Sequence, residues 1–209
     1  MRIIAGTAKG MKLAAPEGLG SRPVLDRVKE SWFGMLDARA GTRGIEGARV
    51  LDLYSGVGSL GLEALSRGAA TCVFVESDPE CARLLDHHIE RARFQDRAEV
   101  RRTRVEIALP DLARERQRFD LVFLDPPFEL AGREDFYAER GVLERAGELL
   151  APGGLAMLRR EAAEKEGVGA KEPHGLALAD RRAWGRNEVL FLAGRSAEED
   201  PSPSASHLS

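Results

Sequence analysis

A carboxylate and three glycines lie close together in the segment DLYSGVGSLG, which runs from Asp52 to Gly61. Glycine has no Cβ and tolerates positive φ, so such a turn lets the backbone approach a ligand closely. The turn follows an apolar run and precedes a helical pattern, which is typical of nucleotide sites in α/β proteins but also of a plain tight turn. Its candidate ligand-binding residues are Asp52, Tyr54, Ser55, Gly56, Gly58 and Gly61.

A second carboxylate, Glu76, ends the next apolar run, 18 residues beyond Gly58, and Ser77 follows it. An acidic side chain at this position suits a ribose diol, because one carboxylate can accept hydrogen bonds from both hydroxyls. Glu76 and Ser77 therefore join the candidate cofactor residues. The pattern fits NAD and S-adenosylmethionine equally, so at this point the cofactor stays open between the two.

A third group, Asp125-Pro126-Pro127-Phe128, follows the apolar run FDLVFL. The exocyclic amine of a nucleobase is a poor nucleophile, so a catalyst must hold its N–H bonds and aim the nitrogen at an electrophile. The Asp125 carboxylate can accept one N–H and the Pro126 carbonyl the other. Pro127 stiffens the turn, and the Phe128 ring can stack on a flipped base, a contact worth roughly 1–3 kcal/mol. The plainer interpretation is a Pro-Pro turn followed by a core phenylalanine.

Alternating apolar runs and amphipathic stretches must position these groups. From Ala48 the order is strand, helix, strand, helix, which indicates a parallel sheet with helices on both faces and thus an α/β fold. The last of these four elements is a helix over 79–93. Beyond it we expect a weak strand over 99–103, a strand over 119–125, a helix over 137–150, the strand LAMLR, and strands over 176–179 and 188–193.

The first 40 residues have a different pattern. RIIA and MKLAA read as two extended pieces of a hairpin, and apolar spacing predicts a helix over about 26–40 in which Trp32 is a core residue. Residues 1–30 carry six basic and three acidic side chains, a net +3. We expect three regions: an extension over 1–40 made of the hairpin and the helix, an α/β domain over 41–195, and a disordered acidic tail over 196–209.

Composition narrows the class of protein. The chain has 209 residues, 43% apolar and 31% charged, and no uncharged apolar run of about 18 residues, which excludes a collagen, a disordered chain and a membrane-spanning protein. The beginning lacks the apolar core of a secretion signal, and two cysteines are too few for a disulfide scaffold. We expect a cytoplasmic, reduced protein. The net charge of −3 does not decide for or against nucleic acid.

For the histidines and cysteines, the sequence favours structural roles over metal binding or catalysis. His87 and His88 are adjacent on a predicted helix and point about 100° apart, so they are a poor metal pair, and we predict no metal site. Cys72 and Cys81 fall where packing is the expected role. The arginines over 181–186 are one possible RNA contact, although exposed arginines are usually solvated surface.

Together, RIIAGTAKG, RPVLDRVKESWF, DLYSGVGSLGLEALSRGA, VESD and LDPPF make the sequence similar to the bacterial 16S rRNA guanine-N2 methyltransferase family over about residues 1–193. The resemblance implies a Rossmann-like methyltransferase fold with a small amino-terminal extension and S-adenosylmethionine as methyl donor. It also implies methylation of one guanine amine in 16S rRNA. By matching positions, the 52–61 turn and Glu76 would bind the donor, the 125–128 segment would hold the base, and the hairpin with Arg22-Pro23 would contact RNA.

The sequence also departs from that family. Phe33-Gly34 stands where a Phe-Asn pair is usual, and His87-His88-Ile89 where an asparagine usually follows the second strand. Related enzymes often place Asp or Asn after the third strand to meet the adenine amine, whereas this chain has Thr103-Arg104-Val105. The adenine contact is therefore unassigned.

These observations predict an enzyme that transfers the methyl group in line, with no covalent intermediate, and that uses Asp125 as proton acceptor. The expected partner is 16S rRNA within a small ribosomal subunit or an assembly intermediate, and the protein is expected to be a monomer away from membranes. Three alternatives stay open: a DNA adenine-N6 methyltransferase, which would use the same Asp-Pro-Pro-Phe group, an NAD-dependent oxidoreductase, and a nonenzymatic RNA-binding module. The oxidoreductase lacks an evident proton donor near the sheet edge.

Overall fold

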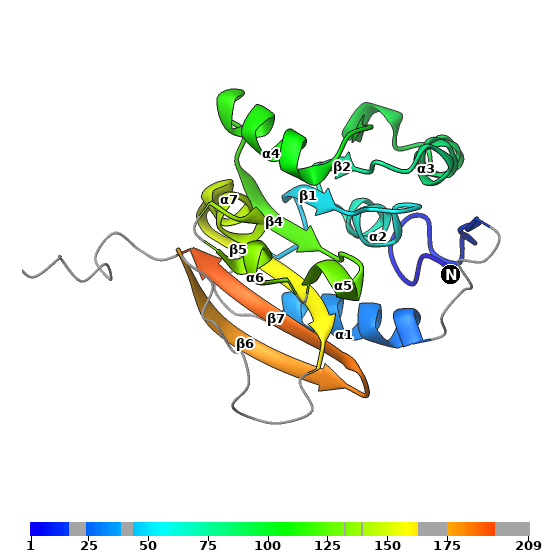
Figure 1. Ribbon diagram of the computed structural model, residues 1–209. Helices are drawn as coiled ribbons and strands as arrows, with labels where there is room; N and C mark the ends of the chain where they lie inside the picture. The colour runs from blue at the N-terminus through cyan, green and yellow to red at the C-terminus, as the bar shows by residue number, and fades with distance from the viewer. Residues whose placement is uncertain (17–23, 39–43, 132, 139, 163–174, 195–209) are drawn as a thin grey trace, which may run out of the picture.

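The computed structural model describes residues 1–16, 24–38, 44–131, 133–138, 140–162 and 175–194. Its centre is one seven-stranded sheet, built from β1 (Arg49–Leu53), β2 (Thr71–Val75), β3 (Ala98–Arg101), β4 (Phe119–Leu124), β5 (Leu150–Glu161), β6 (Leu176–Trp184) and β7 (Asn187–Gly194). The spatial order is β3-β2-β1-β4-β5-β7-β6 (Figure 1). The first five strands are parallel, β7 is antiparallel to β5, and β6 is antiparallel to β7.

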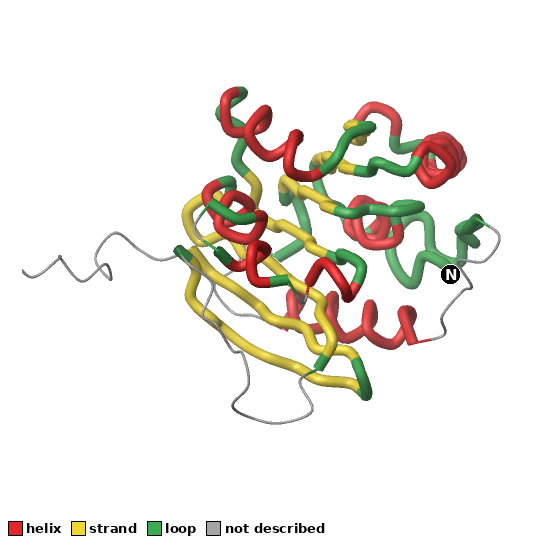
Figure 2. Tube along the Cα trace, viewed as in Figure 1, coloured by secondary structure: helices red, strands yellow, loops and turns green. Residues whose placement is uncertain are grey.

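Helices cover both faces of this sheet. They are α1 (Val24–Ala38), α2 (Ser59–Ser66), α3 (Pro79–Ala92), α4 (Val105–Arg114), the short α5 (Phe128–Ala131) and α6 (Glu134–Tyr137), and α7 (Val142–Glu148), with a 3-10 turn over Gln95–Arg97. Residues of α1, α2 and α3 pack in one apolar cluster with the sheet, and residues of α4 and α7 pack in a second cluster on the opposite face (Figures 1 and 2). The helices on both faces of a sheet, predicted from the alternating pattern, are confirmed, and so is the Rossmann-like fold that the family resemblance implies.

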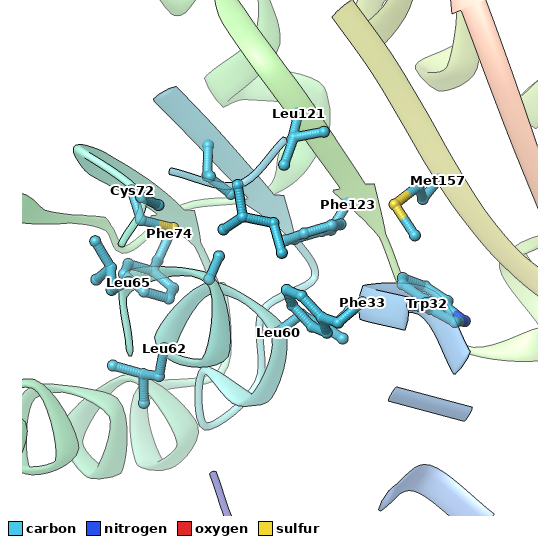
Figure 3. Packing of buried hydrophobic residues seen from close by; sticks show 14 of the residues in the cluster. Trp32, Phe33, Leu60, Leu62, Leu65, Cys72, Phe74, Leu121, Phe123 and Met157 are labelled. Carbon is cyan, nitrogen blue, oxygen red and sulfur yellow. The ribbon is translucent and has the colours of Figure 1, made fainter. Parts of the chain in front are cut away.

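The strand sequences follow from this double coverage. A parallel strand covered on both faces needs apolar side chains on both sides, and β1 and β2 are each buried at every position after the first. Trp32 and Phe33 of α1 pack on Phe123 of β4, with ring centroids 6.1 Å and 5.8 Å apart (Figure 3). The predicted core role of Trp32 is confirmed, and α1 shares the core of the sheet.

The amino-terminal segment docks on α2 through a buried carboxylate. Backbone N–H groups of Ile4 and Ala5 donate to the two oxygens of Glu63, at 2.7 Å and 3.0 Å. Glu63 is fully buried and also pairs with Lys29 at 3.5 Å. At Gly6, where φ is +78°, a Cβ would lie 1.7 Å from the Ser66 carbonyl oxygen, so only glycine allows this approach. The segment is thus built into the fold.

Several element predictions were wrong in detail. The two expected extended pieces do pair antiparallel, through one bridge from Arg2 to Lys12 and through the Ile3 N–H, which donates to the Met11 carbonyl at 3.0 Å, but they are too short to be regular strands. The helix expected over 137–150 begins only at Val142, because Arg140 has a positive φ of 61° just before it. Helix α4 was not predicted, since its Pro110 resembles a helix breaker. Strand β6 extends beyond the predicted 176–179, to Trp184. The predicted tail over 196–209 lies outside the described residues.

Candidate functional site at the carboxyl edge of the sheet

The sheet reverses its direction of growth between β1 and β4. β1 pairs with β2 on one side and with β4 on the other, and the last residue pair of β1 and β4 is Leu53 beside Leu124. The segments that follow these two strands therefore lie side by side, and Asp125 N–H donates to the Leu53 carbonyl at 3.4 Å. Open α/β sheets bind ligands in the crevice at such a switch point. The structure brings the glycine turn and the Asp-Pro-Pro-Phe group together there.

Asp52, at the floor of this crevice, is only 1% exposed. One carboxyl oxygen accepts the Gly61 N–H at 2.8 Å, while Oδ1 is buried and has no hydrogen-bond partner in the described part of the chain. Burial raises the pKa of Asp52 to about 8, and the nearby charges of Asp125 and Glu76 add to this effect. Ser55 Oγ is also buried without a partner among the described residues. Two polar atoms of the turn are thus left for a ligand to satisfy.

The three glycines of the turn have different roles. At Gly56, where φ is +54°, a Cβ would meet no atom within 4 Å, so this residue faces open space. At Gly58 a Cβ would lie 2.4 Å from the Leu85 side chain, and at Gly61 it would lie 2.3 Å from the Phe74 ring. Gly58 and Gly61 therefore allow α2 to pack closely, and Gly56 is the one glycine of the turn that leaves room beside the backbone.

Glu76 connects the turn to the end of β2. One carboxylate oxygen accepts the Gly56 N–H at 2.7 Å, and the other accepts the Asp78 N–H at 2.7 Å. Each oxygen can accept a second hydrogen bond, so the carboxylate can still bind hydroxyl groups. Ser77 is exposed beside it and makes no hydrogen bond through its side chain within the described ranges.

The Asp125–Phe128 segment turns directly into α5. The Pro127 carbonyl accepts from the N–H groups of Leu130 and Ala131 at 3.0 Å and 3.1 Å, which begins the helix. The Pro126 carbonyl accepts none of the hydrogen bonds found in the described part of the chain. Phe128 is half-buried and Pro127 is exposed.

One residue that the sequence analysis missed, Arg159 of β5, contacts this segment. Its Nε donates to Asp125 Oδ1, and its guanidinium carbon lies 4.9 Å from the centroid of the Phe128 ring. The pair is mostly buried, with 13% of the Arg159 side chain and 24% of the Asp125 side chain exposed. The available signal was two basic residues, Arg159 and Arg160, in a row at the end of an apolar strand.

A cavity of about 330 Å³ opens beside Tyr54, on the α4 and α7 side. Its lining includes Arg104 and Glu106, which form an ion pair at 3.4 Å, and also Phe136 and Arg145. Burial and the charge of Glu106 raise the pKa of Tyr54. Glu106 belongs to helix α4, which the sequence pattern did not predict.

The basic residues predicted to contact RNA lie in two regions, the first 30 residues and the segment over 181–186. Lys9 and Lys12 are exposed, whereas Lys29 is 2% exposed and pairs with the buried Glu63. The side-chain positions of Arg22 and Arg27 lie outside the described part. The arginines of β6 and its turn are each paired with a carboxylate: Arg181 with Glu188, Arg182 with Asp180 and Arg186 with Glu161. These pairs make that cluster a weaker anion site than its sequence indicated.

The two histidines have the structural roles expected of them. His88 is buried, its Nε2 accepts from the Ala14 N–H at 3.0 Å, and its Nδ1 lies 3.1 Å from the Val57 carbonyl. His87 is exposed. Cys72 and Cys81 are both buried, as packing predicts. Among the described residues, no three His, Cys, Asp or Glu side chains gather as metal ligands would, and no helix has the length and apolar character needed to cross a membrane.

Comparison with known proteins gives a consistent result. The family described as conserved hypothetical protein 95 matches residues 1–193. The chain is 34% identical over 189 residues to the putative rRNA methyltransferase YlbH of Bacillus subtilis strain 168, covering 84% of this chain and all of that protein. It is 34% identical over 154 residues to ribosomal RNA small subunit methyltransferase D of Escherichia coli strain K12, covering 74% of this chain and 68% of that protein.

Solved structures match over most of the chain. A hypothetical protein of Thermus thermophilus, TTHA0928, superimposes with a TM-score of 0.72 and 31% identity, covering 92% of this chain and 99% of that one. SMU.776, a structure that contains SAH, superimposes with a TM-score of 0.60 and 16% identity, covering 78% of this chain and 48% of that one. The second match shows a shared fold.

Proposed function

Since the chain belongs to the conserved hypothetical protein 95 family, we propose that it transfers a methyl group from S-adenosylmethionine to the N2 amine of a guanine in 16S rRNA. One observation carries the proposal: two groups with different tasks meet at the switch point of the sheet. The Gly56 and Glu76 pair suits a nucleoside, and the Asp125-Pro126 pair suits an exocyclic amine. The name of the Escherichia coli relative supports the rRNA substrate.

The residues around the glycine turn fit S-adenosylmethionine. The buried Asp52 Oδ1 and Ser55 Oγ lack partners among the described residues, and the ammonium group of a bound methionine moiety would supply donors. Glu76 would accept the ribose hydroxyls, beside the open face of Gly56. These assignments make Asp52, Ser55, Gly56 and Glu76 the donor-binding residues of the proposal.

The cavity beside Tyr54 suits the adenine end of the donor. Tyr54, which precedes Ser55 in the glycine turn, lines this cavity. Glu106 offers a carboxylate there, which could accept hydrogen bonds from the adenine amine. We therefore assign the contact with the adenine amine to Glu106, because the sequence has no Asp or Asn for it at Thr103-Arg104-Val105.

At the other side of the crevice, Asp125 and Pro126 would hold the target amine. S-adenosylmethionine, when bound, supplies an electrophilic methyl group on its sulfonium. The Asp125 carboxylate and the Pro126 carbonyl each accept one N–H, which turns the nitrogen lone pair toward that methyl group. The methylated nitrogen is positively charged and therefore strongly acidic, so the weakly basic Asp125 carboxylate can take the surplus proton.

Label transfer tests the proposal. Wild-type protein and radiolabelled S-adenosylmethionine are incubated with small ribosomal subunits or their precursors from cells that lack this protein. Large subunits and double-stranded DNA serve as parallel substrates. We expect label in small-subunit RNA alone. Label in DNA with none in rRNA would favour the adenine methyltransferase instead, and calorimetric binding of NAD in place of S-adenosylmethionine would favour the oxidoreductase.

A further inference from the structure

Arg159 lies beside the proposed amine-holding residues because of strand register. Leu124 at the end of β4 pairs with Leu158 of β5, so Asp125 and Arg159 are the next residues on neighbouring strands. The Arg159 guanidinium contacts Asp125 through Nε, faces the Phe128 ring at 4.9 Å, and donates from Nη1 to Asn187 Oδ1 at 3.0 Å. Three partners from two segments, the Asp-Pro-Pro-Phe segment and β7, thus fix one planar group.

The next residue provides a natural comparison. Arg160 points to the other side of β5, as alternation along a strand requires, and donates to Glu188 of β7 at 2.6 Å. Its side chain is 12% exposed, against 13% for Arg159, and its carboxylate partner is fully buried. The two arginines are therefore neighbours on one strand, each with a mostly buried guanidinium group paired with a carboxylate. Only Arg159 contacts the Asp-Pro-Pro-Phe segment among the described contacts.

We propose that Arg159 is a positioning residue for methyl transfer, which holds the Asp125 carboxylate and the Phe128 ring in the orientation that receives the target base. This inference rests on the proposed function, since it assigns a role within the same site. The ion pair fixes the orientation of the Asp125 carboxylate, which is a hydrogen-bond acceptor for N–H groups. The guanidinium lies against one face of the Phe128 ring, so the base stacks on the other face.

The expected effect is on the chemical step. Arg159 does not need to contact the base or the donor to act, because both of its partners rotate about single bonds that its three contacts restrict. A displacement of about 1 Å in a reacting group can lower the rate on the order of 100-fold. Binding of S-adenosylmethionine depends on the glycine turn and Glu76, which Arg159 does not contact in the described structure.

The test compares Arg159→Met, Arg159→Lys and the matched control Arg160→Met in the wild-type background. We expect Arg159→Met to lower kcat for rRNA methylation about 10- to 100-fold, with the KM for RNA and the Kd for S-adenosylmethionine within about threefold of wild type. Arg159→Lys restores a charge but not the planar contact with Phe128, so it should recover part of the lost kcat. Arg160→Met should lower thermal stability and keep kcat within about threefold.

A double variant distinguishes a positioning role that acts through Asp125 from a general loss of structure. If Arg159 acts through Asp125, adding Arg159→Met to Asp125→Asn should lower kcat little further than Asp125→Asn alone. Normal kcat in Arg159→Met, equal losses in Arg160→Met, or fully additive losses in the double variant would each overturn the inference. The wild-type substrate test is separate: if wild type methylates DNA adenine instead, the proposed substrate is wrong, and the same ratios are then measured on DNA.

Discussion

Replacing Glu76 by Gln should weaken S-adenosylmethionine binding while the fold persists. The carboxylate accepts from Gly56 N–H and from Asp78 N–H, both at 2.7 Å, and a glutamine offers one oxygen and one NH₂ group. One backbone N–H would then face another donor, and the ribose hydroxyls would lose a charged acceptor. Hydrogen bonds to charged groups are worth about 1.5–3 kcal/mol, which corresponds to a Kd roughly 10- to 150-fold higher.

Isothermal calorimetry with S-adenosylmethionine measures this change directly. Glu80→Gln is the matched control, because Glu80 is an exposed carboxylate in the first turn of the helix that follows, and we expect its Kd to equal that of wild type. Circular dichroism of both variants checks that they fold. A folded Glu76→Gln protein that binds within about threefold of wild type would refute the ribose assignment.

Three further predictions concern catalysis, RNA binding and pH. Asp125→Asn should keep the Kd for S-adenosylmethionine within about threefold but lower single-turnover methyl transfer at least about 100-fold; near-normal transfer would remove its amine-holding role. The exposed pair Lys9→Ala and Lys12→Ala should reduce the slope of log affinity against log salt by about 1.4–1.8, since each phosphate contact contributes about 0.7–0.9; an unchanged slope would place RNA elsewhere. Burial lowers the pKa of His88 below 6.5, so as pH falls through and below 6.5 the unfolded chain takes up a proton that native His88 resists. The free energy of unfolding in urea should therefore decrease toward acid pH; His88→Gln should flatten this dependence, His87→Gln should not, and equal slopes in both would contradict the assignment.

Local sequence was sufficient for the central strands and for the glycine turn. β1, β2 and β4 are short apolar runs ended by Asp52-Leu53, by Glu76 and by Asp125, and a doubly covered parallel strand requires such runs. The order of the elements then places their carboxyl ends at one edge. Glu76 and Asp125 could be assigned to a common crevice for this reason.

Contacts between distant segments could not be predicted. Arg159 reaches Asp125 across 34 residues, and Lys29 reaches Glu63 across 34 residues, so neither pairing leaves a periodic signal. The +3 balance of residues 1–30 overstated the available charge, because one of its lysines is buried against a carboxylate. Glu106 was missed for a local reason, since Pro110 obscures the helix that carries it.

The central claim is the identity of the methylated atom, and nucleoside analysis measures it. Small ribosomal subunits that lack this modification are incubated with wild-type protein and labelled S-adenosylmethionine, and the 16S rRNA is digested to nucleosides and resolved by chromatography with mass detection. The account predicts that the label elutes as N2-methylguanosine and that Asp125→Asn lowers its amount at least about 100-fold. Label that elutes as N6-methyladenosine would contradict the account.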